Sequence, residues 1–157
     1  MKRFKSNYIC IVLLAAGFAA SSFSCSKGDK ADNYANKNEI ISRKMKIQVN
    51  SKVFTATLAD NATARAFSKM LPLTINMKEL NGNEKYFDLP SSLPAQPTNP
   101  GNVKNGDIML YGTNTLVFFY QPFSTLYSYT RIGTLDNIEG YINALGTGPI
   151  SVKLRLE

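Results

Sequence analysis

The chain has 157 residues, enough for one domain, and carries a formal net charge of +7. It has no histidine, which excludes histidine-based nucleophile systems and histidine metal sites, and both of its cysteines lie in the first 25 residues. Residues 45–157 hold ten basic and eight acidic residues, so most of the positive charge lies outside the predicted domain and nucleic-acid binding is not expected.

Residues 1–25 have the pattern of a signal peptide. A basic start, MKRFK, precedes the apolar run YICIVLLAAGFAA, and small residues follow before Cys25. The apolar run is shorter than the roughly 20 residues that a transmembrane helix needs. We therefore expect the protein to be exported. The polar residues 26–44, which contain few aromatics, are expected to form a flexible tether.

The end of this signal segment, Ser22-Phe23-Ser24-Cys25, resembles a bacterial lipobox, although Ser22 stands where an aliphatic residue is typical. The resemblance implies lipidation of Cys25, a membrane anchor, and a location in the cell envelope on the periplasmic or outer-membrane side. The alternative is simple secretion with an unmodified thiol, since Ser22 and Ser24 would also suit an ordinary signal peptidase.

The predicted domain, residues 45–157, begins with a β-hairpin. Apolar and polar residues alternate over residues 45–58 on both sides of a turn at Asn50-Ser51. The residues predicted to face the core are Ile47, Val49, Val53, Ala56 and Leu58. An N-cap at Asp60-Asn61 then predicts a helix over residues 62–71, which Pro72 ends. The side of this helix predicted to be apolar contains Ala62, Ala66, Phe67 and Met70.

Two further hairpins follow in the middle of the chain. Asn81-Gly82 favours a tight turn between strands over residues 73–80 and 84–89. Residues 90–106 contain four prolines and predict a long surface loop. Strands over residues 108–111 and 116–120 then flank a turn at residues 112–114, and a further strand ends at Gly133.

The last two predicted elements are a helix and a strand. Residues 135–145 predict a helix with Ile138, Tyr141, Ile142 and Leu145 at helical spacing and Gly146 at its end. Alternation over residues 149–156 predicts the closing strand. The predicted fold class is therefore mainly β, with eight strands in a closed or nearly closed antiparallel barrel and two helices capping its ends.

Three blocks of this chain, LPLTINMKELNGNEKYFDLP, GDIMLYGTNTLVFFY and SYTRIG, resemble the bacterial cyclophilin-like fold family, whose members are largely uncharacterised. The resemblance covers about residues 45–157 and implies a cyclophilin-type barrel of eight strands and two helices. Relatives of this kind occur as free-standing domains, as lipoproteins and beside flavodoxin-type domains, which implies a possible link to redox or small-ligand chemistry.

The resemblance does not extend to the residues of prolyl isomerases. Authentic cyclophilins use an F-H-R block, a Q-G-G-D block and further Trp and His residues, and this chain has neither block, no His and no Trp. Gly106-Asp107 matches only two residues of one block. We therefore assign no catalytic residue, expect no cofactor and no metal, and lean away from an enzyme.

One cluster of side chains is a candidate ligand cleft. By strand alternation, Tyr129 and Arg131 share one face of their strand, as Glu84 and Tyr86 share one face of theirs. Arginine holds carboxylate or phosphate by paired hydrogen bonds, and aromatic rings supply apolar contact. The hypothesis is a cleft for a small anionic or peptide-like ligand, lined by Arg131, Tyr129, Tyr111, Phe119, Glu84 and Tyr86.

The alternative for this cluster is structural: Arg131 pairs with Glu84 or Asp107, and the tyrosines complete the barrel wall. For the whole protein, we expect an envelope-anchored binding module for a small ligand or peptide. Two other classes stay open. One is an enzyme, either a peptidyl-prolyl isomerase or an accessory to flavodoxin-type redox chemistry, and the other is a structural component of the envelope.

Overall fold

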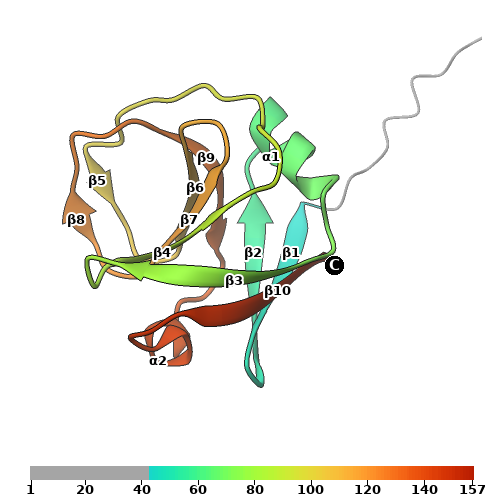
Figure 1. The fold of residues 1–157 in the computed structure, drawn as a ribbon, viewed down its shortest axis with the longest axis vertical. Helices are drawn as coiled ribbons and strands as arrows, with labels where there is room; N and C mark the ends of the chain where they lie inside the picture. Colours follow the sequence, from blue (N-terminus) through green and yellow to red (C-terminus); the bar gives the residue numbers. More distant parts are fainter. Residues whose placement is uncertain (1–42) are drawn as a thin grey trace, which may run out of the picture. The chain divides into compact units, whose positions relative to one another are not determined.

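Eight strands close into an antiparallel barrel in the computed structural model, which describes residues 43–157 (Figure 1). The barrel order is β1-β10-β3-β4-β7-β6-β9-β2, and β5 and β8 form a separate two-stranded sheet. The elements in chain order are β1 (Lys44–Val49), β2 (Lys52–Leu58), α1 (Ala62–Ser68), β3 (Leu73–Leu80), β4 (Glu84–Asp88), β5 (Asn102–Val103), β6 (Asp107–Tyr111), β7 (Thr115–Phe119), β8 (Phe123–Ser124), β9 (Tyr129–Leu135), α2 (Tyr141–Leu145) and β10 (Ile150–Leu156).

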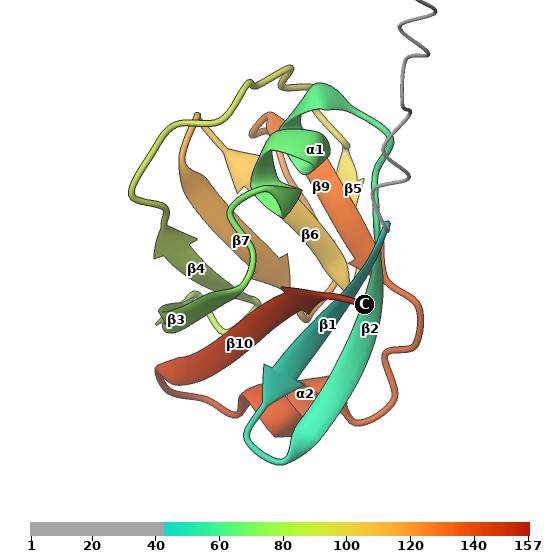
Figure 2. The same cartoon turned by 90° about the vertical axis from the view of Figure 1, so that its right-hand side faces the viewer.

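The two helices lie at opposite ends of this barrel, α1 at one end and α2 at the other (Figure 2). The fold class predicted from the sequence, a mainly β domain with an eight-stranded antiparallel barrel and two helices, is therefore confirmed. Neither helix within residues 43–157 is long and apolar enough to cross a bilayer. The predicted signal peptide, Cys25 and most of the predicted tether lie outside the described residues.

The first hairpin corrects one predicted core residue. In the β1–β2 register Ile47 lies opposite Phe54, and residues directly opposite each other share a face of the sheet. Phe54, Ala56 and Leu58 are therefore buried, whereas Val53 is 56% exposed. The prediction that Val53 belongs to the core is wrong, because it is one residue out of phase with the buried face of β2.

The first helix begins where the sequence predicts and ends earlier. The side chain of Asn61 caps it by accepting a hydrogen bond of 2.7 Å from the amide of Ala64. The helix ends at Ser68 rather than at residue 71, and its buried face contains Thr63, Ala64, Phe67 and Ser68. Ala62 is exposed, so its predicted place on the core face is wrong. Thr63 can face inward because its hydroxyl donates to the carbonyl of Pro94 at 2.6 Å.

The second helix is much shorter than predicted. Leu135 is the last residue of β9 and lies opposite Ala56, so the chain is still extended where a helix was expected. Gly140 adopts φ 71, a left-handed conformation outside the α-helical region, so the helix cannot extend to residues before it. The helix α2 therefore begins at Tyr141. Tyr141 and Leu145 are buried as predicted, but Ile138 and Ile142 are exposed.

The proline-rich segment between β4 and β6 is fastened along the barrel instead of standing away from it. The amide of Leu93 donates to the carbonyl of Thr113 at 2.7 Å, and Thr98 forms an antiparallel bridge with Tyr129. Leu93 and Val103 are buried. The segment therefore covers part of the outer surface, and its strand β5 pairs with β8, whose Phe123 lines the site described below.

Candidate functional site

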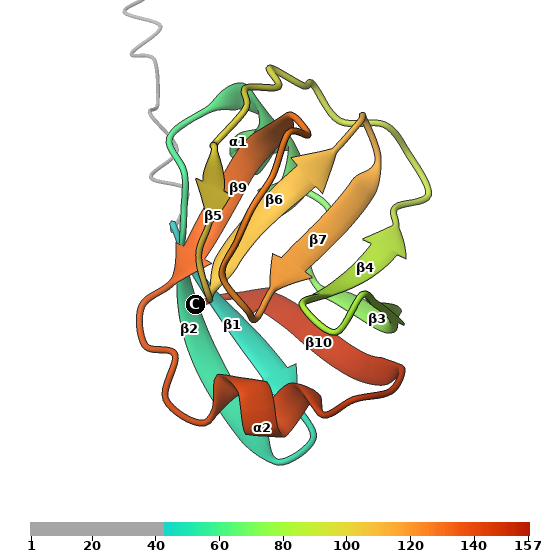
Figure 3. The ribbon, with the colours of Figure 1, turned by 90° about the vertical axis from the view of Figure 1, so that its left-hand side faces the viewer.

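A second apolar cluster lies on the outer face of β7, β6 and β9, outside the barrel interior. Strand alternation points Ile108 and Phe118 inward, where both are fully buried, and points Met109 and Val117 outward. Figure 3 shows β4, β7, β6 and β9 side by side in the order that their pairing gives. The outer cluster consists of Val103, Met109, Val117, Phe119 and Tyr129, with Tyr86 and Phe123 packed against it.

A cleft of about 400 Å³ opens above this cluster. We call it the aromatic cleft, because four tyrosines and one phenylalanine contribute to its walls. Its volume lies within the range of roughly 300–1,000 Å³ that is usual for small-molecule sites. The side chains that line it are Leu80, Asn81, Glu84, Tyr86, Asp88, Tyr111, Thr115, Val117, Phe123, Tyr127 and Tyr129.

The rings around the cleft form a continuous series of contacts. Tyr111 meets Tyr127 edge to face with centroids 5.9 Å apart, and it meets Tyr129 at 5.6 Å. Tyr129 in turn packs edge to face on Phe119 at 5.4 Å, and Phe119 contacts Phe123 at 5.7 Å. These separations are the preferred ones for aromatic pairs, so each ring holds its neighbour in place. The ring contacts therefore connect β6, β7, β8 and β9 along one side of the cleft.

Glu84 is the buried acidic group of the cleft. It is 8% exposed, and its carboxylate forms no hydrogen bond or ion pair with any residue from 43 to 157. Burial first, and repulsion from Glu79 second, raise its pKa from the ordinary 4.5 to about 6. Burial and then the Glu84 charge also raise the pKa of the Tyr129 hydroxyl, which places these two side chains within electrostatic reach of each other.

The structure brings together four of the six side chains predicted for the cleft: Tyr129, Tyr111, Glu84 and Tyr86. Phe119 is fully buried and packs against the ring of Tyr129, and it does not line the cleft.

Arg131 is likewise absent from the lining. Its Nη1 pairs with Oδ1 of Asp107 at 2.7 Å, and the other oxygen of this almost buried carboxylate accepts from the amide of Lys104 at 2.9 Å. Asp107 is one of the two partners expected for Arg131 if its role is structural.

Sequence reasoning did not identify Tyr127, Phe123, Asp88 or Leu80 as lining residues. Asp88 shares the strand face of Glu84 and Tyr86, so strand alternation alone could have added it. Tyr127 and Phe123 lie in the segment between β7 and β9, and their placement depends on the β5–β8 pairing, in which Val103 lies opposite Phe123. No local sequence pattern predicts the β5–β8 pairing, because each of the two strands has only two residues.

A buried lysine lies on the opposite face of β4. Lys85 is fully buried and lies opposite Glu79 of β3, with which it forms an ion pair. Its ammonium also donates to the carbonyls of Gly146 at 2.9 Å and Gly148 at 2.7 Å. Glu79 additionally accepts from the hydroxyl of Tyr120 at 2.6 Å. All three ammonium protons are thus used within the fold, which makes this network structural: it fixes the segment between α2 and β10.

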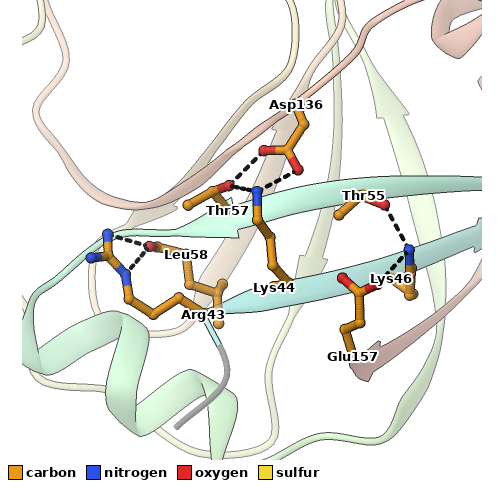
Figure 4. Close-up of polar contacts among 8 residues, drawn as sticks. All are labelled: Arg43, Lys44, Lys46, Thr55, Thr57, Leu58, Asp136 and Glu157. Carbon is orange, nitrogen blue, oxygen red and sulfur yellow. Dashed lines mark hydrogen bonds and ion pairs between the residues drawn. The ribbon is translucent and has the colours of Figure 1, made fainter. Parts of the chain in front are cut away.

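A larger and more polar hollow, about 750 Å³, lies beside β1 and β2. Three of its five charged lining residues have an ion-pair partner: Lys46 contacts Glu157 at 3.1 Å, and Asp136 contacts Lys44 at 2.8 Å (Figure 4). Burial alone would raise the pKa of Asp136, but hydrogen bonds from Lys44 and Thr57 outweigh it and lower that pKa. The hollow is lined mainly by polar and charged side chains and has one aromatic ring, Phe54, so it is the weaker candidate for an organic ligand.

Among residues 43–157, no group of three or more acidic side chains is placed to hold a metal ion.

The fold and the cleft define a small antiparallel barrel domain with a concave aromatic site on its outer wall. The model of the Cyclophilin-like family matches residues 47–157, so the chain belongs to that family. The solution structure of the hypothetical protein AF2241 from Archaeoglobus fulgidus is similar, with 16% sequence identity and a TM-score of 0.49 over 74% of this chain and 96% of that one. No curated protein matches the chain.

Proposed function

We propose that this cyclophilin-like domain is a binding module whose aromatic cleft takes a small organic ligand or a side chain of a peptide. The observation that carries the proposal is the exposure of apolar surface around the cleft. Leu80, Tyr111 and Tyr127 line it and are 41%, 45% and 63% exposed. Large apolar side chains that gather in a concavity, beside a few polar groups, are the usual mark of a ligand site.

The proposal places this module in the cell envelope, because residues 1–25 have the pattern of a signal peptide and Cys25 stands at the position of a lipidated cysteine. A polar segment of about twenty residues between Cys25 and the barrel would hold the domain away from the membrane surface. In this arrangement the cleft samples ligands in the envelope space rather than in the membrane.

A fragment screen by protein-observed NMR tests the binding proposal. The full chain, in a neutral detergent, is exposed to a library of small cationic, neutral and anionic aromatics. We expect ligands that shift the amide signals of β4, β6, β7 and β9 and that lose this effect in Tyr111→Ala. Ile138→Ala is the matched control, because Ile138 is exposed to a similar degree but lies outside the cleft. A library without such ligands, or ligands that bind Tyr111→Ala equally well, would refute the proposal.

A further inference from the structure

Three groups of observations on the aromatic cleft concern the charge of its ligand: the state of Glu84, the tyrosine faces, and the distribution of cationic side chains. From them we infer that the cleft selects small organic cations, meaning a protonated or quaternary amine on an apolar body. This inference rests on the proposed function and adds to it the ligand class.

The carboxylate of Glu84 provides the first argument. A buried carboxylate normally has a cation or several hydrogen-bond donors beside it, because ionisation in an apolar site without a partner is costly. Glu84 has neither among residues 43–157, although it is 8% exposed and lines the cleft. Its neighbour Lys85 points to the other face of the strand and is fully used by Glu79, Gly146 and Gly148. The Glu84 oxygens are not among the fully buried atoms without a partner, so they are open to the solvent in the cleft. An ammonium group there would replace that solvent with an opposite charge.

The aromatic rings provide the second argument. The face of a tyrosine ring carries negative potential and attracts cations within about 6 Å of its centroid. Tyr86, Tyr111, Tyr127 and Tyr129 all line the cleft. One of these rings already has a cationic partner in the fold, since the ammonium of Lys78 lies 5.7 Å from the centroid of Tyr86. Tyr129 is buried, but Tyr111 and Tyr127 are 45% and 63% exposed, so these two rings are accessible to a ligand.

The distribution of charge provides the third argument. The ionised side chains that line the cleft are Glu84 and Asp88, and none of its lining residues is Lys or Arg. The expectation of an anionic ligand depended on Arg131, whose guanidinium instead pairs with Asp107 at 2.7 Å. An anion in the cleft would therefore meet two carboxylates, while the nearby ammonium of Lys78 lies over the Tyr86 ring and outside the lining, and Coulomb repulsion would weaken binding of the anion.

Three probes that share one ring test the inference: 2-phenylethylammonium, 2-phenylethanol and phenylacetate. Each is titrated into the full chain in a neutral detergent at pH 7.5, and dissociation constants are taken from the amide shifts of the cleft strands. We expect the amine to bind about tenfold more tightly than the alcohol, and phenylacetate to bind more weakly than the alcohol. Glu84→Gln should bring the amine to the affinity of the alcohol and leave the alcohol unchanged.

A lysine-containing peptide, acetyl-Gly-Lys-Gly-amide, separates a free amine from a peptide side chain as the source of the cation. The cleft volume of about 400 Å³ is at the small end of the usual range for ligand sites, which predicts that the small amine binds more tightly. Tighter binding of the peptide would overturn the assignment of a small free ligand.

The two levels of the proposal fail differently. If the alcohol or phenylacetate binds in the cleft as tightly as the amine, the cationic preference is overturned while the binding function stands. If Glu84→Gln keeps the full preference for the amine, the role of this carboxylate is refuted. If none of the probes shifts the signals of the cleft strands, the ligand class is contradicted, and the proposed function fails as well only if the fragment screen also yields no ligand that depends on Tyr111.

Discussion

Replacing Glu84 by Gln should change how the stability of the domain depends on pH. The unfolded chain releases the Glu84 proton near pH 4.5, whereas the folded domain keeps it until about pH 6. Between these values the unfolded state binds fewer protons, so the stability of the wild type falls as pH rises. Below pH 4.5 the carboxyl is neutral in both states and contributes no penalty.

The size of this penalty follows from the pKa difference. A rise of about 1.5 in pKa, at about 1.36 kcal/mol for each pKa unit, gives about 2 kcal/mol. The free-energy difference between Glu84→Gln and wild type should therefore move by about 2 kcal/mol in favour of the variant between pH 4 and pH 8. With a urea m-value of about 1–3 kcal/mol per molar, the midpoint shift is on the order of 1 M.

Urea unfolding of both proteins at half-unit pH steps measures this difference directly. Comparing the variant with wild type at each pH cancels the other carboxylates, including Asp136, whose lowered pKa acts in the opposite direction. Glu139→Gln, in the exposed loop before α2, is the matched control and should show no such trend. A flat difference between wild type and Glu84→Gln would refute the account of a buried carboxylate without a partner.

Three further predictions concern other parts of the chain. Lys85→Met should lower the free energy of unfolding by about 3 kcal/mol in the same urea assay, because Glu79 and the carbonyls of Gly146 and Gly148 lose the ammonium that they bind. The control variant Lys78→Met should lower it by less than about 1 kcal/mol. Arg131→Ala should lower the free energy of unfolding by about 1–2 kcal/mol, because it leaves the Asp107 carboxylate, whose side chain is only 5% exposed, without its ion-pair partner. The affinity for 2-phenylethylammonium should not change. A folded Arg131→Ala variant that no longer binds the amine would show that Arg131 belongs to the binding site. Cys25→Ser should abolish incorporation of labelled fatty acid in cells while Cys10→Ser keeps it, and a label that persists in Cys25→Ser would contradict lipidation.

Local patterns predicted the strands of the barrel well. The turns at Asn50 and at Asn81-Gly82 lie where the sequence places them, and these residues adopt the positive φ values of 54, 56 and 72 that such turns need. The prediction for residues 135–145 was wrong because helical spacing of apolar residues does not reveal that Leu135 already pairs with Ala56. Tertiary pairing overrode the periodicity there.

The candidate site was predictable to the extent that it is built from strand alternation. Tyr111, Glu84, Tyr86 and Tyr129 meet in the cleft because they occupy outward positions on adjacent strands. Arg131 shares the outward face of Tyr129 but lies opposite Met109, one step further along β9, and its guanidinium pairs with Asp107 near the shift in the β6–β9 register. Such a bulge leaves no mark in a single sequence.

The charge preference of the aromatic cleft is tested most directly by one NMR titration of the full chain with 2-phenylethylammonium and phenylacetate. We expect the amine to shift the amide signals of Tyr111, Val117 and Tyr129, and phenylacetate at the same concentration to shift them much less. Equal or larger shifts produced by phenylacetate at these residues would contradict the cationic preference, as would shifts by the amine that map instead to Lys46 and Thr55 of β1 and β2.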